Sequence, residues 1–331
     1  MSSAFEQAVA KFGDLKVLVV GDVMLDVFEF CHTDKSKPID SEKTGKRAYE
    51  VVQSPTAIGG AGNVAANLVS LGAKASLIGV TGNDGSYFTL AEIADKLEIE
   101  HTFVRDPHRP TTTKTRLYID DEYQLRKDRE SADKVGKEIS LTLVSAALES
   151  IPTVDAVILS DYNKGVFSEN LASSILETCK EKKVPVVVDF KPPNREQFKG
   201  AYLLVPNENE ADQLNPGFKG REGDDLQGAA SALNNDLGSE NLVVTLGSRG
   251  ICGCGQNTEF FHLPGNTVEE VDAVGCGDTV RAALALGCAA GLDLKDAADL
   301  ANDAAAVIVQ KPSTASLNSQ ELLDFRRAKG G

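Results

Sequence analysis

Short runs of aliphatic and β-branched residues alternate with helical stretches along most of the chain. Residues 16–22, "KVLVVGD", form a continuous apolar run of the kind that is typical of a strand buried on both faces. Residues 62–73 then have helical spacing and a glycine near their end. Further strands are predicted at 75–82, 155–161, 184–190, 201–207 and 240–247, and helices at 86–99 and from about residue 168. This order predicts a single α/β domain, 1–331, with a mostly parallel sheet covered by helices on both faces.

Two segments, 27–55 and 112–130, interrupt this alternation. Both alternate polar and apolar residues, as half-exposed strands do, and structureless loops of this length are uncommon. The stretch "YIDDEYQL" within the second segment predicts a hairpin around Asp120 and Asp121. We therefore expect the two segments to form a small antiparallel flap, a lid over the carboxyl edge of the main sheet.

Charge and composition indicate which partners and which cellular location to expect. Asp and Glu number 49 against 34 Lys and Arg, which gives a net charge of −15. A surface of this sign repels nucleic acid. No apolar run reaches the roughly 18–20 residues of a membrane span, and the N-terminus lacks the pattern of a signal peptide, so a cytoplasmic protein without a membrane partner is expected. The six cysteines are scattered without a C-x-x-C pair, which predicts reduced and mostly buried thiols.

The stretch "DAVGCGDT" at 272–279 precedes a predicted helix. The N–H groups of Gly275, Cys276 and Gly277 would lie at the start of that helix, where unpaired amides attract anions. Asp278 follows in the first turn. There its negative charge could simply interact favourably with the helix dipole, or its carboxylate could accept a proton from a hydroxyl that attacks phosphorus. This string alone leaves both interpretations open.

Gly59, Gly60 and Gly62 enter another predicted helix. A dinucleotide-binding fingerprint would need G-x-G-x-x-G directly after the first strand. Here the glycines come about 40 residues later, after the first flap segment. A dehydrogenase is therefore disfavoured.

Six motifs follow one another along the chain: "GDVMLD" (21–26), "GGAGNVAAN" (59–67), "SDYNKG" (160–165), "PNENE" (206–210), "VTLGSRG" (244–250) and "DAVGCGDT" (272–279). In this order they resemble the ribokinase-like (PfkB) carbohydrate kinases over nearly the whole chain. "GDVMLD", "SDYNKG" and the segment "TKTRLY…QLRKDRE" are most similar to bacterial D-glycero-β-D-manno-heptose-7-phosphate kinases. The resemblance is to the kinase half of such proteins only.

The resemblance implies a three-layer fold that binds ATP and Mg²⁺. Asp278 matches the family's catalytic base, and Gly275, Cys276 and Gly277 match the anion hole for the transferred phosphoryl group. Asn207 and Glu210 match the motif that orders Mg²⁺ through water, although "NENE" is also typical of a capped helix start. Further positions match nucleotide-binding ones: Thr245, Gly247, Gly250 and Asn302. Without the resemblance these would be an ordinary strand end and a surface asparagine.

On the sugar side, Asp26 and Asn63 match positions that hydrogen-bond hydroxyl groups, and Gly59 and Gly60 would let a substrate approach the backbone. A phosphorylated sugar also needs cations. The candidates are Arg116, Arg126, Lys164 and Lys191, each of which could instead be a solvated surface charge.

The chain departs from the heptose kinases at several points. An "R-I-S-P-E-A-P" type stretch is replaced by residues 34–52, and "D-P-K-G" by "DFKPP" at 189–193. Val274 replaces a threonine, and Cys276 an alanine. Cys276 still supplies an N–H group, and its thiol is expected to be a packed side chain and not a nucleophile. A helix N-terminus would lower its pKa, so sensitivity to oxidation is a secondary hypothesis. Asp272 and the loop 311–316 match a region that binds a monovalent cation, K⁺, in relatives.

We therefore expect an ATP-dependent kinase whose best acceptor is D-glycero-D-manno-heptose 7-phosphate, converted to the 1,7-bisphosphate. The alternatives are another sugar phosphate, a simple sugar or a nucleoside as acceptor. A non-catalytic sugar-binding regulator on the same fold would be expected to lack the base or the anion-hole glycines, and both are present. By resemblance, a homodimer that pairs through the flap is expected.

Overall fold

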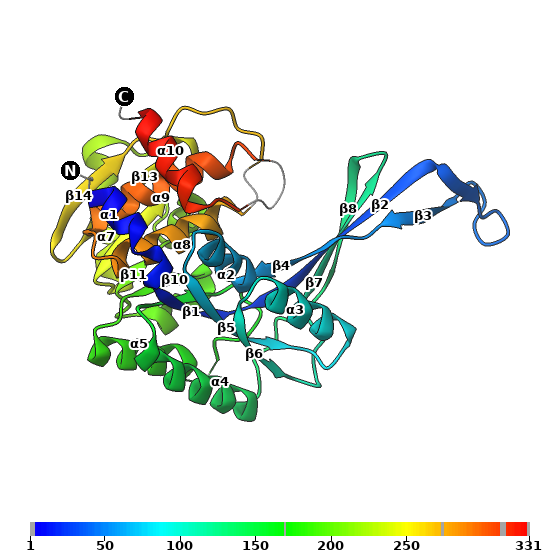
Figure 1. The fold of residues 1–331 in the computed structure, drawn as a ribbon, viewed down its shortest axis with the longest axis horizontal. Helices are drawn as coiled ribbons and strands as arrows, with labels where there is room; N and C mark the ends of the chain where they lie inside the picture. Colours follow the sequence, from blue (N-terminus) through cyan, green and yellow to red (C-terminus); the bar gives the residue numbers. More distant parts are fainter. Residues whose placement is uncertain (1–3, 169, 273–274, 312–315, 330–331) are drawn as a thin grey trace.

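A computed structural model describes residues 4–168, 170–272, 275–311 and 316–329 (Figure 1). Its main sheet has the strand order β14-β13-β12-β11-β10-β9-β1-β5-β6. The pairings from β6 to β12 are parallel, while β13 and β14 add antiparallel strands at one edge. The predicted mostly parallel sheet is confirmed. Its strands are β1 Lys16–Gly21, β5 Lys74–Thr81, β6 Glu100–Arg105, β9 Ala156–Ser160, β10 Val186–Asp189, β11 Leu203–Leu204, β12 Asn241–Thr245, β13 Ile251–Gly255 and β14 Thr258–Leu263.

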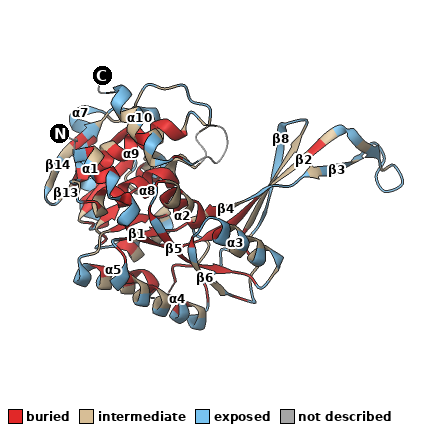
Figure 2. Cartoon of the chain, in the orientation of Figure 1, coloured by how far each residue is buried: buried red, intermediate tan, exposed pale blue. Residues whose placement is uncertain are grey.

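Helices cover both faces of this sheet, so the body has three layers (Figures 1 and 2). Successive side chains of a strand point to opposite faces. Accordingly Val17 and Val19 of β1 belong to one buried cluster, and Leu18 and Val20 to the other. The first cluster includes α1 Ala4–Ala10, α2 Ala61–Ser70, α3 Gly85–Lys96, α8 Cys276–Ala289, α9 Leu294–Ile308 and α10 Ser319–Lys329. The second includes α4 Lys137–Ser150, α5 Leu171–Lys182, α6 Glu208–Leu214 and α7 Gly223–Leu237.

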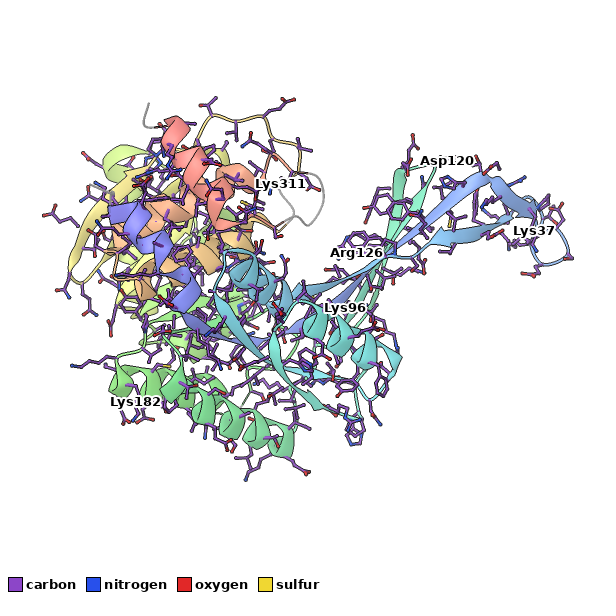
Figure 3. The ribbon with its side chains drawn as sticks, viewed as in Figure 1. Lys37, Lys96, Asp120, Arg126, Lys182 and Lys311 are labelled. Atoms are coloured by element: carbon purple, nitrogen blue, oxygen red, sulfur yellow. The ribbon has the colours of Figure 1, made fainter. Side chains whose placement is uncertain are left out.

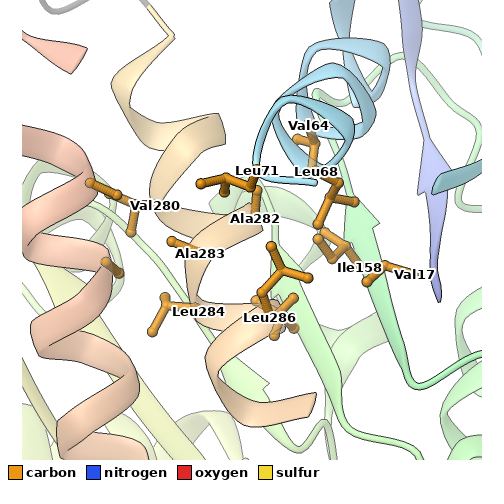
Figure 4. Close-up of a cluster of buried hydrophobic side chains, with 14 of the residues drawn as sticks. Val17, Val64, Leu68, Leu71, Ile158, Val280, Ala282, Ala283, Leu284 and Leu286 are labelled. Carbon is orange, nitrogen blue, oxygen red and sulfur yellow. The ribbon is translucent and has the colours of Figure 1, made fainter. Parts of the chain in front are cut away.

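Helices α2 and α8 pack against each other on the same face of the sheet (Figure 4). Leu68 of α2 and Leu286 of α8 are fully buried there, above Val17 and Ile158 of the sheet. Burying one such side chain stabilises the fold by about 1.5–3 kcal/mol. The two helices are also joined by a hydrogen bond, because the hydroxyl of Thr279 donates to Oδ1 of Asn67 over 2.8 Å. The core thus fixes α2 and α8 side by side.

A second sheet, the flap, extends from the body (Figure 1). Its strand order is β3-β2-β7-β8, and β4 Thr56–Gly60 pairs with β2. The bounds are β2 Val23–Pro38, β3 Arg47–Gln53, β7 Thr113–Ile119 and β8 Glu122–Arg129. The predicted hairpin is present: Asp120 (φ 50°) and Asp121 (φ 66°) form its turn, far from the body in Figure 3. Two left-handed residues are what a tight hairpin turn of this kind requires.

The flap is mixed, whereas the sequence pattern predicted an antiparallel sheet. The pairing between β2 and β7 is parallel and brings Asp26 beside Lys114. The reason is that β2 and β7 both leave the carboxyl edge of the main sheet in the same direction. Strand β2 also begins at Val23, before the expected start at residue 27, as a direct continuation of the chain that leaves β1.

The two faces of the flap carry different side chains. Neighbours across paired strands point to the same face. Asp26, Lys114 and Arg116 therefore share one face. Glu29 lies on the other face, where it forms an ion pair with Lys127 over 2.9 Å.

The cysteines are unpaired, as predicted: Cys31, Cys179, Cys252 and Cys254 are buried, and Cys276 and Cys288 are half-buried. In the part of the chain that the structure describes, we find no helix with the length and apolar character needed to cross a membrane.

Candidate active site

The N-terminus of α8 combines a glycine turn with a buried carboxylate. Gly275 precedes the helix with φ 82°, a left-handed conformation that glycine adopts without steric cost. Cys276 and Gly277 are the first helical residues, and Asp278 is buried in the first turn. The backbone N–H groups of this turn can bind an anion, and a carboxylate stands next to them.

Side chains from three segments orient the carboxylate of Asp278. Its Oδ2 accepts a hydrogen bond from Nδ2 of Asn63 in α2, over 2.7 Å. Its Oδ1 accepts one from the hydroxyl of Tyr162 over 2.8 Å, and lies 3.3 Å from Nη1 of Arg281. These donors are anchored to the core of the protein, so they hold the carboxylate in a fixed position beside the glycine turn.

Tyr162 lies in the "SDYNKG" loop, whose conformation depends on Asp22. Oδ2 of Asp22 accepts hydrogen bonds from the backbone N–H of Tyr162, over 2.7 Å, and of Lys164, over 3.1 Å. Burial raises the pKa of Asp22 to about 6. Burial and the nearby charge of Asp278 raise the pKa of Tyr162 well above its ordinary value, so its hydroxyl stays a proton donor to Asp278.

Arg281 connects Asp278 with a second buried carboxylate, Asp189 at the end of β10. Nη2 of Arg281 is 2.8 Å from Oδ1 of Asp189, and both side chains are less than one-tenth exposed. Burial raises the pKa of Asp189 to about 6. Burial opposes the charge of Arg281, but Asp189 and Asp278 outweigh it and raise the pKa of the guanidinium.

A cavity of about 500 Å³ opens beside the glycine turn. Gly247 (φ 62°) and Gly250 (φ 89°) shape one wall of this cavity after the end of β12. Asn302 of α9 is not a surface asparagine: it is buried, and its Nδ2 donates to the carbonyl of Pro264 over 2.9 Å. The cavity brings together most of the predicted nucleotide-binding residues and the anion hole: Asn207, Thr245, Gly247, Gly250, Asn302, Cys276 and Gly277.

Asn207 and Glu210 form a capping box at the start of α6. The side chain of Asn207 accepts from the N–H of Glu210, and Oε2 of Glu210 accepts from the N–H of Asn207, both over 3.0 Å. The other oxygen of Glu210 is 2.5 Å from Nζ of Lys191. The capping interpretation is thus realised: Asn207 lines the cavity, while Glu210 is buried and both of its oxygens are paired within the protein. Only an ion that keeps several waters, as Mg²⁺ does, could be held by this pair. The described residues include no group of three or more His, Cys, Asp or Glu that could cage a metal.

Asp26 and the two glycines lie where the flap joins the body. Oδ1 of Asp26 is 2.6 Å from Nη1 of Arg116. A Cβ atom on Gly59 would lie 2.2 Å from Oδ2 of Asp26, so a larger residue there would displace this carboxylate. Gly60 has φ 58° and precedes α2, the helix that carries Asn63.

Three of the four predicted phosphate-binding cations gather at the flap, and each has a carboxylate partner. Arg116 pairs with Asp26, Arg126 with Asp128 over 2.8 Å, and Lys164 with Glu130 over 2.7 Å. Lys114, which the motif analysis did not single out, pairs with both Asp128 (3.1 Å) and Glu130 (3.2 Å).

Lys191, the fourth candidate, lies away from the flap. Its Nζ pairs with Glu210 and sits 5.4 Å from the ring centre of Tyr162.

The expected monovalent-cation region is only partly described. Val274 and residues 312–315 lie outside the described residues. Asp272 is half-buried, and its N–H donates to the carbonyl of Val309 over 3.2 Å. The expected low pKa of Cys276 is wrong: burial raises the pKa of its thiol to about 11, which outweighs the helix N-terminus.

Residues 14–321 match the pfkB family carbohydrate kinases, and the chain belongs to that family. Its enzyme class is therefore ATP-dependent carbohydrate kinase, as the motifs predicted.

Two relatives, each named Bifunctional protein HldE, come from Trichlorobacter lovleyi and Desulfatibacillum aliphaticivorans. The first is 34% identical over 98% of this chain and 64% of its own length. The second is 35% identical over 95% of this chain and 63% of its own length. The chain thus spans a little under two thirds of the length of these relatives.

Two solved structures share the fold. The tetrameric inhibited form of phosphofructokinase-2 from Escherichia coli superposes with a TM-score of 0.76 at 15% identity, covering 96% of this chain and 100% of that one. Ribokinase from Thermotoga maritima does so with a TM-score of 0.70 at 23% identity, covering 95% and 99%. The ribokinase-like fold that the motifs implied is confirmed.

Proposed function

We propose that this carbohydrate kinase transfers the terminal phosphoryl group of ATP to a sugar hydroxyl with Asp278 as the base. The observation that carries this proposal is the buried carboxylate of Asp278, held by Asn63 and Tyr162 beside the glycine turn at the start of α8. A carboxylate held in this way can accept a proton from an attacking hydroxyl.

In the proposed reaction, the sugar oxygen attacks the terminal phosphorus of ATP. A new P–O bond forms, the P–O bond to ADP breaks, and the hydroxyl proton passes to Asp278. The N–H groups of Gly275, Cys276 and Gly277 stabilise the charge on the transferred group. Mg²⁺, when bound with ATP, neutralises phosphate charge, and Asn207 and Glu210 would hold its waters.

We further infer that the acceptor is D-glycero-D-manno-heptose 7-phosphate and the product the 1,7-bisphosphate. The motifs of the flap and of the "SDYNKG" loop resemble heptose 7-phosphate kinases, and both relatives above share the name HldE. Lys114, Arg116 and Lys164 supply three cations on the side of Asp26, where the sugar hydroxyls would bind. A phosphate group bound there would replace the carboxylate partners of these cations with its own oxygens.

The same ion pairs support a second candidate, a neutral sugar or nucleoside as acceptor. Because every one of these cations has a carboxylate partner, the charges around Asp26 are close to balanced without a phosphate. An acceptor that leaves these pairs intact would bind through hydrogen bonds to Asp26 and Asn63 instead.

A panel of acceptors, assayed by ADP release, distinguishes the two candidates. We expect kcat/KM to be roughly 100-fold higher for heptose 7-phosphate than for the unphosphorylated heptose, because the neutral sugar has no phosphate to bind the cations of the flap. Equal values for the two sugars, or a reaction with the neutral sugar alone, would exclude the phosphorylated acceptor.

We also propose that the protein is a homodimer that pairs through the flap. Four large apolar side chains are exposed on its outer strands, Tyr49 and Val51 on β3 and Tyr123 and Leu125 on β8. Sedimentation of the Tyr123→Lys variant should show a shift toward monomer.

We propose K⁺ as an activating ion near Asp272, to be tested by exchange of K⁺ for Na⁺ in the assay.

A further inference from the structure

Arg281 is a buried cation on the wall of the nucleotide cavity, and the proposed reaction does not use it. It lies one turn after Asp278, with Nη1 3.3 Å from Oδ1 of that carboxylate. A Cβ atom on Gly277 would lie 2.7 Å from the same Nη1. The guanidinium therefore packs against Gly277 in the glycine turn and reaches the carboxylate of Asp278 from the same cavity wall.

The hydrogen bonding of Arg281 is incomplete. A guanidinium has five N–H donors. Nη1 faces Asp278 and Nη2 faces Asp189, while Nε is buried and has no hydrogen-bond partner among the described residues. A buried arginine with unused donors is costly unless another anion completes its shell.

Asp189 holds this cation from the side opposite to Asp278. Both of its oxygens are buried and accept no hydrogen bond from the described residues; the positive charges that face it are those of Arg281, at 2.8 Å, and of Lys191. One guanidinium thus stands between two buried carboxylates. Asp189 holds Nη2 of Arg281 over 2.8 Å, so the guanidinium is anchored on the side away from Asp278.

We propose that Arg281 is a catalytic residue whose guanidinium donates hydrogen bonds to the terminal phosphoryl group of ATP during transfer, and that Asp189 positions it. This inference rests on the proposed function. The phosphoryl oxygens carry spread negative charge in the transition state, and a preorganised cation in a water-poor site stabilises it. Arg281 keeps its own protons, and the proton of the acceptor still passes to Asp278.

The test compares Arg281→Met and Arg281→Lys with the unmodified protein. Removal of one such donor lowers kcat by about 100-fold in other enzymes, and we expect a loss of that order for Arg281→Met. Affinity for a non-hydrolysable ATP analogue should fall about tenfold, while affinity for ADP stays within about twofold, because only the terminal phosphoryl group is contacted. Arg281→Lys keeps the charge and should recover part of kcat.

Two further variants separate catalysis from folding. The double variant Arg281→Met with Asp189→Asn removes the buried pair together, so Asp189 is not left as an uncompensated charge, and it should stay as slow as Arg281→Met. Arg326→Met removes an ion pair with the buried Asp303 outside the site, and it should lower the melting temperature without changing kcat.

Turnover of Arg281→Met within about threefold of the unmodified protein, or an equal loss of ATP-analogue and ADP affinity, would overturn the inference. Asp278→Asn, measured in parallel, distinguishes this from a failure of the proposed function. An inactive Asp278→Asn beside an active Arg281→Met contradicts only the role of Arg281, whereas activity in both contradicts the proposed reaction itself.

Discussion

The start of α8 and the flap are both rich in charged side chains, but they hold them differently. Around Asp278, the side chains of Asp189 and Arg281 are less than one-tenth exposed. On the flap, Arg126 is 47% exposed and Lys127 58%, while Lys114 and Arg116, on the face of Asp26, are 16% and 19% exposed. Breaking a buried pair costs several kcal/mol, whereas an exposed pair contributes about 0–1 kcal/mol. The ion pairs of the body are therefore the most firmly fixed, those on the face of Asp26 are intermediate, and the outer pairs of the flap separate most easily.

Replacement of Arg116 by Met should give the largest change on the flap side. If Arg116 binds the acceptor phosphate, the loss of one charge-assisted contact raises the KM for the sugar phosphate roughly 10- to 100-fold. The KM for ATP should not change. Steady-state kinetics with each substrate varied in turn measures both.

Lys127→Met is the matched control, because Lys127 lies on the opposite face of the same sheet and pairs with Glu29. It should leave both KM values unchanged. An equal rise in sugar KM for the two variants would show that the effect comes from flap charge in general and not from a contact with Arg116.

On the side of the body, replacement of Tyr162 by Phe should lower kcat about tenfold, since it removes one donor to Asp278. Steady-state kinetics measures this loss. Tyr202→Phe, a change outside the active site, is the control and should leave kcat unchanged. A kcat of Tyr162→Phe equal to that of the unmodified protein would contradict a role for this contact in turnover.

The smallest effect concerns stability. The pKa of Asp22 rises from 3.8 to about 6 on folding. Its favourable contribution is complete below about pH 4 and is lost as the pH rises through about 6, because the unfolded chain releases the proton first. Two pKa units correspond to about 3 kcal/mol.

In Asp22→Asn this dependence disappears, so the free energy of unfolding should fall less steeply between pH 4 and 6 than in the unmodified protein. Urea denaturation at several pH values measures the two slopes. Parallel slopes would show that Asp22 is ionised alike in the folded and unfolded chain.

The local sequence pattern was sufficient to predict the main sheet and the hairpin of the flap. The apolar runs marked the parallel strands, and the turn residues Asp120 and Asp121 marked the hairpin, because backbone preferences and burial depend on neighbouring residues. The glycine turn before Asp278 was visible for the same reason. The sequence pattern also placed Thr245, Gly247 and Gly250 at a strand end, where the structure has them beside the cavity.

Contacts between distant residues could not be predicted in this way. Asn63 and Asp278 are 215 positions apart, and Tyr162 and Asp278 are 116 apart. Tyr162 and Arg281 both stood inside or beside quoted motifs, yet nothing in the string shows that their side chains meet at one carboxylate. The parallel pairing of β2 with β7 was missed because it depends on the direction in which both strands leave the main sheet.

The most direct test of the account is the turnover of Asp278→Asn, measured with ATP affinity and melting temperature in the same preparation. Asparagine keeps the size of the side chain and loses the basic oxygen. We expect kcat to fall by roughly 1,000-fold, within the range that a lost general base gives, while ATP affinity and melting temperature stay near those of the unmodified protein. Turnover within about threefold of the unmodified protein would contradict the claim that the start of α8 is where the transfer occurs.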